Sequence, residues 1–277
     1  NPRSNLKKKI QFILKNFYNI ALYKDRFSSL LKKKSIHHLL SKDIINVDHH
    51  LSHISSSVFI SNFEDATCLS LDGFGDFCSG AVGTYKNNKI KIDKRIYFPH
   101  SLGVFYHALT QYLGFTNFGD EYKIMGLSGY GNPTLKSKIY NLIKFDENNF
   151  YKLNLKYFNF FKKNYFNNNG IPEFNKLYSN NIIEVLGHPR KKDEIITEYH
   201  KDLACSLQTV YEEIFFKILN KIFKKYKQKK LCFAGGCALN SLANGKIYEN
   251  TDFEKVFIPA FPGDSGGAIG AALYNFY

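Results

Sequence analysis

Residues 66–76 read ATCLSLDGFGD. The beginning of this stretch has the length and apolar character of a buried strand, and its end is a glycine-rich turn between two carboxylates. A similar order recurs at residues 231–236, LCFAGG, ahead of a predicted helix. A third apolar run, 255–258, leads through PAFPGDSGG into a helix predicted over 268–277. Strands that feed glycine-rich turns and then helices indicate an α/β fold with ligands at the strand ends.

The remaining predicted elements follow from apolar periodicity and turn signals. Asn87-Asn88 lies between two strand-like runs, which is typical of a hairpin. These elements are strands over 79–85 and 90–98 and helices over 51–63, 102–113 and 194–226.

One domain is predicted over residues 1–277, because the chain has no internal repeat and no long linker. Residues 1–45 form a helical lead-in, in which apolar residues recur at helical spacing between lysines. Residues 146–192 are rich in Asn, Phe, Tyr and Lys but poorly periodic, and we interpret them as an insertion-like region of short strands and loops.

The formal net charge of +14 would suit a nucleic-acid partner, but the lysines are scattered in short runs. Compositional bias or a general field for anionic ligands explains such a charge better than a nucleic-acid footprint. The five cysteines contain no C-x-x-C pair, which favours a reducing compartment. No signal peptide is visible, and no apolar run reaches the roughly 18 residues of a membrane span. We therefore expect a cytoplasmic protein without a membrane or nucleic-acid partner.

Residues 49–53 read HHLSH, and His49 and His53 lie four residues apart. On a helix, residues at this spacing share one face and can bind one ion. Two imidazoles do not complete a site, and an added carboxylate would suit iron, manganese or zinc. Alternatively, these histidines only cap or fill the start of a helix.

The turn after the first strand contains Asp72 and Asp76, with Gly73 and Gly75 between them. Glycines can adopt the positive φ angles of tight turns. Backbone N–H groups exposed by such turns bind phosphate oxygens, and the carboxylates could hold a metal ion. An ordinary Asp-Gly hairpin turn explains the same residues equally well.

Two further glycine-rich turns could approach a ligand. Gly235 and Gly236 end a buried strand and precede a helix, whose N-terminus favours an anion. Residues 262–272, PGDSGGAIGAA, contain small residues that permit close helix packing. Asp264 in this stretch could cap the helix or point into a cleft as a ligand.

Six motifs, in this order, resemble the NodU/CmcH/TobZ carbamoyltransferase family, a nodulation-protein-like group. They are HHLSH at 49–53, SLDGFGD at 70–76, FPHSLG at 98–103, GDEYKIMGL at 119–127, AGGCALN at 234–240 and PGDSGG at 262–267. The similarity runs from about residue 45 to the C-terminus and is loose over 146–192. It implies an actin/hexokinase-like (ASKHA) ATPase-type α/β fold related to the universal tRNA threonylcarbamoyl-transferase.

The resemblance implies an O-carbamoyltransferase that uses carbamoyl phosphate and ATP to form a carbamoyl-adenylate. The carbamoyl group would pass to a hydroxyl of a sugar, antibiotic or similar metabolite, as in antibiotic or polysaccharide biosynthesis. A divalent metal, with Fe²⁺ preferred, would bind the adenylate phosphate and polarise the carbamoyl group. Transfer to tRNA and a non-catalytic nucleotide-binding module are the alternatives.

The family motifs also assign residues to the site. The implied metal ligands are His49, His53, Asp72 and Asp264. His49, Asp72 and Lys123 would be catalytic, with Lys123 compensating phosphate charge, although a solvated loop lysine is the alternative. The implied cofactor-binding residues are Gly73, Gly75, Asp76, Gly235, Gly236, Asn240, Gly263 and Gly266.

Two parts of the family pattern are not found in this sequence. Family members begin with a strand–turn segment that carries the first phosphate loop, and they carry a C-terminal YrdC-like domain. We therefore expect an incomplete first lobe, and a YrdC-like domain or chain as a partner. A fragment and a split system are both compatible with this expectation.

Overall fold

The computed structural model describes residues 45–161 and 176–277. The chain divides into two compact units, Asn1–Asn46 and Val47–Tyr277. The sheet, its helices and the candidate site all belong to the second unit. Apart from Ile45, the predicted helical lead-in lies outside the described residues.

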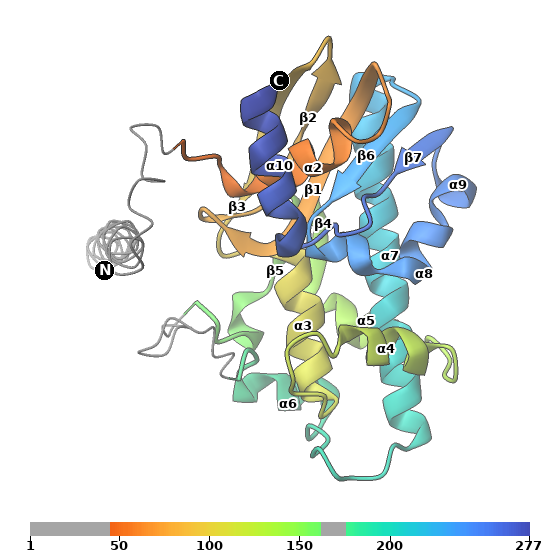
Figure 1. Ribbon diagram of the computed structural model, residues 1–277. Coiled ribbons are helices and arrows are strands. Elements are labelled where there is room, and N and C mark those ends of the chain that lie inside the picture. Colours follow the sequence, from red (N-terminus) through yellow and green to blue (C-terminus); the bar gives the residue numbers. More distant parts are fainter. Residues whose placement is uncertain (1–44, 162–175) are drawn as a thin grey trace, which may run out of the picture. The chain divides into compact units, whose positions relative to one another are not determined.

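A five-stranded mixed sheet forms the centre of the second unit (Figure 1). Its spatial order is β3 (Lys89–Tyr97), β2 (Cys78–Lys86), β1 (Asp65–Gly75), β6 (Lys230–Ala234) and β7 (Lys255–Phe257). The pairs β1–β2 and β2–β3 are antiparallel, whereas β1–β6 and β6–β7 are parallel. The predicted α/β class is confirmed, and β1, which contains the strand predicted at the beginning of 66–76, is the central one.

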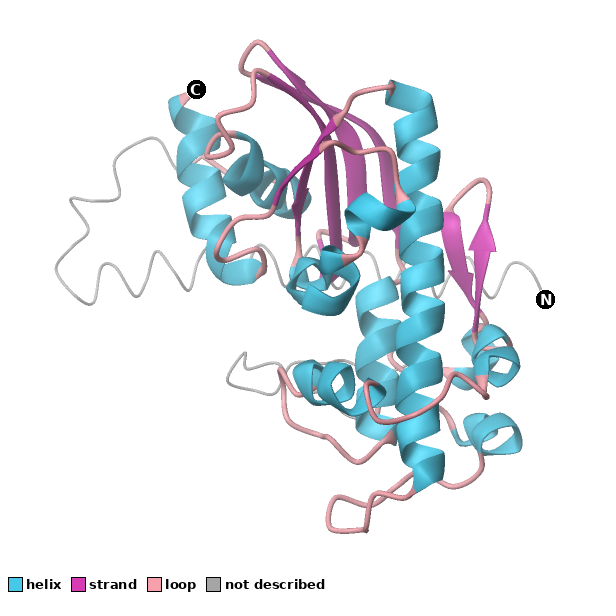
Figure 2. Ribbon diagram, turned by 90° about the vertical axis from the view of Figure 1, so that its right-hand side faces the viewer, coloured by secondary structure: helices cyan, strands magenta, loops and turns pink. Residues whose placement is uncertain are grey.

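Helices cover both faces of this sheet (Figures 1 and 2). On one face lie α2 (His49–Val58) and α10 (Asp264–Phe276), and on the other lie α3 (Leu102–Tyr112) and α7 (Glu198–Tyr226). Cys68 of β1 packs in the core beneath α2, whereas Leu69 packs in the core of the opposite face. A strand buried on both faces is apolar along most of its length, which explains why β1 was visible in the sequence.

Shorter elements lie around these layers. They are α4 (Glu121–Ser128), α5 (Lys136–Tyr140), α6 (Ile183–Leu186), α8 (Ser241–Gly245), α9 (Ile247–Asn250), the hairpin β4 (Ile143–Asp146) and β5 (Phe150–Leu153), and the 3₁₀ turns η2 (Leu155–Tyr157), η3 (Asn180–Ile182) and η4 (Gly236–Leu239). In the described part of 146–192, the short strand β5 agrees with the prediction of short strands and loops, whereas η2, η3 and α6 are helical elements that it did not include. This region also contributes Tyr151 and Phe158, both fully buried, to the core around α7.

Several boundaries differ from the predictions. The helix α2 begins at His49 rather than at residue 51, because Asp48 caps it. The helix α10 begins at Asp264 rather than at residue 268. The helix expected after Gly236 is a 3₁₀ turn followed by α8. The hairpin at Asn87-Asn88 is confirmed, since both residues have positive φ angles, 51° and 57°.

The turn after β1 also differs from the prediction. The strand continues to Gly75 through a shift of register, and the positive φ angles occur at Asp76 (47°) and Phe77 (63°). A two-residue hairpin of this kind needs positive φ at both central residues. The expectation that Gly73 and Gly75 adopt positive φ was therefore wrong.

Among the described helices, none has both the length and the apolar character of a membrane span.

Candidate metal centre

The start of α2 is held by three carboxylate contacts. Asp48 Oδ1 accepts a hydrogen bond from Leu51 N–H at 2.9 Å, which caps the helix. Arg95 of β3 holds the same carboxylate, with Nη1 at 3.0 and 3.1 Å from its two oxygens. Asp76 Oδ2 accepts the backbone N–H of His49 at 2.8 Å. A free N–H at a helix start favours a carboxylate, so the first ligand candidate sits on a firmly held turn.

His49 and His53 lie on one face of α2, and their Nε2 atoms are 3.0 Å apart. The ring of His49 lies over Gly75, where an added Cβ would come within 2.0 Å of the ring carbons. Gly75 is therefore required for close approach and not for a turn. His50, the remaining histidine of the motif, points away to Ser70 Oγ at 2.9 Å. Burial lowers the pKa of His50 to about 4, so it is a neutral core histidine.

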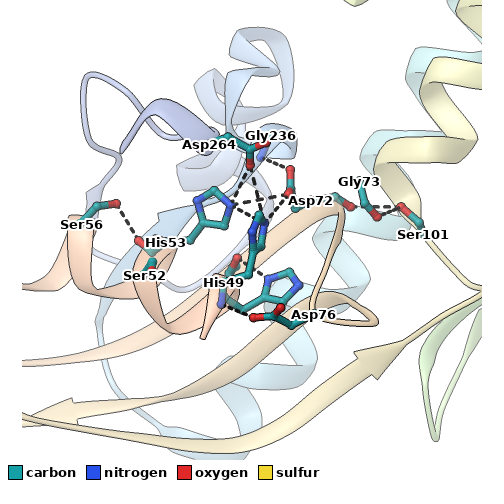
Figure 3. Close-up of polar contacts among 12 residues, drawn as sticks. His49, Ser52, His53, Ser56, Asp72, Gly73, Asp76, Ser101, Gly236 and Asp264 are labelled. Atoms are coloured by element: carbon teal, nitrogen blue, oxygen red, sulfur yellow. Dashed lines mark hydrogen bonds and ion pairs between the residues drawn. The ribbon is translucent and has the colours of Figure 1, made fainter. Parts of the chain in front are cut away.

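Asp72 lies at the end of the central strand and faces both imidazoles (Figure 3). Its Oδ2 is 2.9 Å from His49 Nε2 and 3.5 Å from His53 Nε2. Its Oδ1 accepts the backbone N–H of Gly236 at 2.8 Å. One carboxylate oxygen thus binds the turn that follows β6, while the other points to the two histidines.

Asp264 completes the group because α10 packs very closely on α2. At Gly270, an added Cβ would lie 1.8 Å from the backbone oxygen of Ser52. This approach brings Asp264 Oδ1 to 3.6 Å from His49 Nε2 and 3.5 Å from His53 Nε2. The N-cap of α10 is Gly263, so Asp264 does not cap the helix and points to the imidazoles instead (Figure 3).

The donor atoms of His49, His53, Asp72 and Asp264, here called the His–Asp cluster, all lie within 4.8 Å of one another. Tetrahedral bonds of about 2.1 Å place the donors of one ion about 3.4 Å apart. The five separations that involve a histidine nitrogen, 2.9–3.6 Å, bracket that value. Two imidazole nitrogens and two carboxylate oxygens suit iron, manganese or zinc. The residues present therefore fit a divalent transition metal.

The imidazoles and carboxylates of the cluster shift one another's pKa values. Burial alone would lower the pKa of His53, but hydrogen bonds to Asp264 and Asp72 outweigh it and raise the pKa to about 9. Burial would raise the pKa of Asp72, but hydrogen bonds from His49 and His53 hold it well below its usual range. Without a metal, a proton on His53 compensates the two carboxylates at neutral pH. A bound cation would take over that role.

A cavity of about 450 Å³ opens beside the cluster. Its lining combines three of the four cluster residues, all but Asp72, with polar neighbours and few apolar groups. The lining residues are Val47, His49, Ser52, His53, Asp76, Asp264 and Gly267. A small ligand in this cavity would meet His49, His53 and Asp264 directly.

The other residues predicted for the site lie in different surroundings. Lys123 belongs to α4, and its Nζ pairs with Asp120 Oδ1 at 2.7 Å. It is not in the cavity lining. Asn240 is buried, and its side-chain amide exchanges two hydrogen bonds with that of Gln208, at 2.9 and 3.0 Å. Its oxygen also accepts Ala243 N–H and caps α8. Nucleotide contact by Lys123 and Asn240 stays a prediction.

Several of the glycines predicted to face a nucleotide have packing roles. Gly235 has a φ of +94°, and an added Cβ would lie 2.2 Å from Leu71 O. At Gly236 an added Cβ would lie 2.6 Å from Asp72 Oδ1, so glycine is needed for that hydrogen bond. At Gly266 it would meet Phe261 O at 2.0 Å, whereas Gly73 has open space around it.

Sequence reasoning missed two residues that position the site. Asp48 could have been found, because Asp immediately before a helix is a favoured N-cap. Arg95 carried no such signal, because it lies in a strand and reaches Asp48 only through the tertiary fold.

A family model described as Carbamoyltransferase N-terminus matches residues 2–273. The chain belongs to this family. The resemblance inferred from the six motifs is thereby confirmed at the level of the family.

Comparison with curated proteins gives further relatives. The chain is 36% identical over 228 residues to the uncharacterized protein sll1178 of Synechocystis sp., covering 82% of this chain and 35% of the relative. It is 34% identical to the nodulation protein NolNO of Sinorhizobium fredii, covering 82% and 30%. The uncharacterized protein MJ1051 of Methanocaldococcus jannaschii is 29% identical, covering 99% and 50%. The chain thus spans half or less of the length of these relatives.

The crystal structure of HypF from T. kodakarensis aligns with 87% of this chain and 38% of its own. The TM-score is 0.40 and the sequence identity is 16%, so this likeness is only partial.

Proposed function

We propose that this chain carries the metal site of an O-carbamoyltransferase. The proposed reaction transfers a carbamoyl group from carbamoyl phosphate, through a carbamoyl-adenylate made with ATP, to a hydroxyl of a sugar or secondary metabolite. One observation carries the proposal: a chain of the carbamoyltransferase family brings two imidazoles and two carboxylates to within 4.8 Å of one another. Because the chain spans half or less of its relatives, the activity proposed is that of the whole protein.

The chain's own residues would prepare the site in three ways. His49 and His53 would present Nε2 from one face of α2. Asp72 would present one oxygen, because Gly236 N–H occupies the other. Asp264 would add a carboxylate that is largely exposed and faces the cavity, with a side-chain exposure of 76%. A bound divalent cation, Fe²⁺ in our proposal, would act as a Lewis acid toward phosphate and carbamoyl oxygens.

The finer expectations from the sequence belong to the same proposal. We propose an actin/hexokinase-like arrangement, ATP as the nucleotide and a YrdC-like domain or chain as the partner that makes the carbamoyl-adenylate. A cytoplasmic location is proposed as well. It is supported by the five cysteines, all of which are free thiols.

The experiment measures metal binding and carbamoyl transfer in His49→Ala and Asp264→Ala. Each variant removes one donor of the cluster, so we expect the loss of stoichiometric iron or cobalt binding. Transfer of radiolabelled carbamoyl from carbamoyl phosphate, assayed with ATP and an added YrdC-like protein, should be lost with it. The matched controls are His188→Ala and Asp193→Ala, because both residues are exposed and lie outside the cluster.

Unchanged metal content in both His49→Ala and Asp264→Ala would overturn the ligand assignment. If the unmodified chain binds ATP but shows no turnover with the added YrdC-like protein, a non-catalytic nucleotide-binding module is the better description.

A further inference from the structure

The motif FPHSLG at residues 98–103 contributes no residue to the His–Asp cluster. Its Ser101 side chain nevertheless contacts the backbone of Asp72, one of the four cluster residues. Ser101 is fully buried between β3 and α3. Its Oγ lies 3.0 Å from the backbone oxygen of Asp72 and 2.7 Å from that of Gly73 (Figure 3). The same Oγ accepts Val104 N–H at 3.0 Å and so caps α3. A single hydroxyl thus joins the start of α3 to the end of β1.

Asp72 needs such a contact because it lies just past the regular ladders of the sheet. The parallel pairing of β1 with β6 ends at Ser70 and Ala234. On the other edge, the pairing with β2 shifts register between Leu71 and Gly75. Buried carbonyl groups without a ladder partner cost free energy unless another donor is supplied. The hydroxyl of Ser101 is a donor placed at this gap.

The neighbouring glycine brings α3 close enough for that contact. At Gly103, an added Cβ would lie 3.0 Å from the carbonyl carbon and oxygen of Asp72. The first turn of α3 therefore lies directly against the main chain of the ligand candidate. On the opposite side, Gly236 N–H holds Asp72 Oδ1 at 2.8 Å. Asp72 is held at its main chain by Ser101 and at its side chain by Gly236.

We propose that Ser101 is a positioning residue that sets the orientation of Asp72 as a metal ligand. This inference rests on the proposed metal site and assigns a role to the FPHSLG motif. With its backbone fixed by Ser101 and Oδ1 bound by Gly236, Asp72 can offer only Oδ2 to an ion. Partners that orient metal ligands commonly change metal affinity by about 10–100-fold when they are removed.

The test uses cobalt(II) as the probe, because its visible absorption reports coordination. Ser101→Ala removes the hydroxyl, and with it both the contact to the Asp72 and Gly73 carbonyls and the cap of α3. Ser101→Gly removes the hydroxyl together with Cβ but retains most of the capping free energy. We expect both variants to raise the cobalt dissociation constant about 10–100-fold. Ser179→Ala is the matched control, because its buried hydroxyl also donates to a backbone oxygen, that of Lys156 at 2.7 Å, outside the cluster. It should bind cobalt as the unmodified chain does.

A second readout needs no metal. The amide of Gly236 should exchange its hydrogen slowly in the unmodified chain and in Ser179→Ala, and faster in both Ser101 variants, because its acceptor becomes mobile. Unchanged cobalt affinity or unchanged Gly236 exchange in the two Ser101 variants would overturn the proposal. If the unmodified chain binds no cobalt, the proposed metal site is wrong. The Gly236 exchange rates alone then decide whether Ser101 fixes the position of Asp72.

Discussion

Replacing Gly270 by alanine tests whether the contact between α10 and α2 sets the geometry of the metal site. The added Cβ would lie 1.8 Å from Ser52 O. An ordinary carbon–oxygen contact is about 3.3 Å, so α10 must move by about 1.5 Å. Overpacking of this kind costs about 1–3 kcal/mol, and the better helix propensity of alanine offsets about 1 kcal/mol of that. We expect the free energy of unfolding to fall by about 0–2 kcal/mol.

The effect of Gly270→Ala on metal binding should exceed its effect on stability. Metal–ligand distances tolerate about 0.2 Å, and Asp264 at the start of α10 moves with the helix. We expect cobalt affinity to fall at least about tenfold, which corresponds to about 1.4 kcal/mol. Cobalt titration and urea denaturation of the same preparation measure the two effects.

Gly267→Ala on the same helix is the matched control. Its added Cβ would meet only Ser52 Cβ, at 4.0 Å, which is an ordinary contact. This variant should bind cobalt normally and gain up to about 1 kcal/mol of stability from helix propensity. Equal cobalt affinity in the two variants would refute the idea that close helix packing positions Asp264.

Three further predictions concern His53 and Asn240. The pKa of His53 is raised to about 9, so at neutral pH a proton on His53 competes with the metal. Cobalt affinity should therefore rise about tenfold per pH unit from about pH 6.5 to about pH 8.5. A pH-independent dissociation constant would contradict this. In the metal-free chain, the pKa of His53 is raised from 6.5, its value in the unfolded chain, to about 9. The stabilisation that this shift provides is complete below pH 6.5 and is lost as pH rises through about 9. The midpoint of urea denaturation should therefore fall between these two pH values. Asn240→Ala should lower the free energy of unfolding by about 1–3 kcal/mol, because it leaves buried Gln208 without its amide partner; a change in the ATP-analogue dissociation constant without loss of stability would instead favour a nucleotide contact.

Much of the central architecture could be predicted from the sequence because its causes are local. The burial of β1 on both faces makes it apolar, and the Asn87-Asn88 turn has side chains that tolerate positive φ. The spacing of His49 and His53 on a helix follows from the helical repeat alone. These features need no knowledge of distant parts of the chain.

Other features could not be predicted because they depend on contacts between distant segments. Gly75 and Gly236 resemble turn or phosphate-loop glycines in sequence, but the ring of His49 and the carboxylate of Asp72 require them. From the residues alone, capping was the commoner explanation for Asp264, and only the packing of α10 on α2 shows that it faces the imidazoles. The pairing of Lys123 with Asp120 is local, yet nothing in the sequence separates it from a phosphate-binding lysine.

The position of β1 in the sheet also has a consequence for how the chain reaches its native state. One edge of β1 pairs with β2, which follows it immediately, whereas the other edge pairs with β6, which begins only at Lys230. During synthesis, the hairpins β1–β2–β3 can assemble while that second edge still exposes unpaired N–H and C=O groups. Pairing between distant segments is slow, so the central strand of the mature sheet is an aggregation-prone edge in the nascent chain.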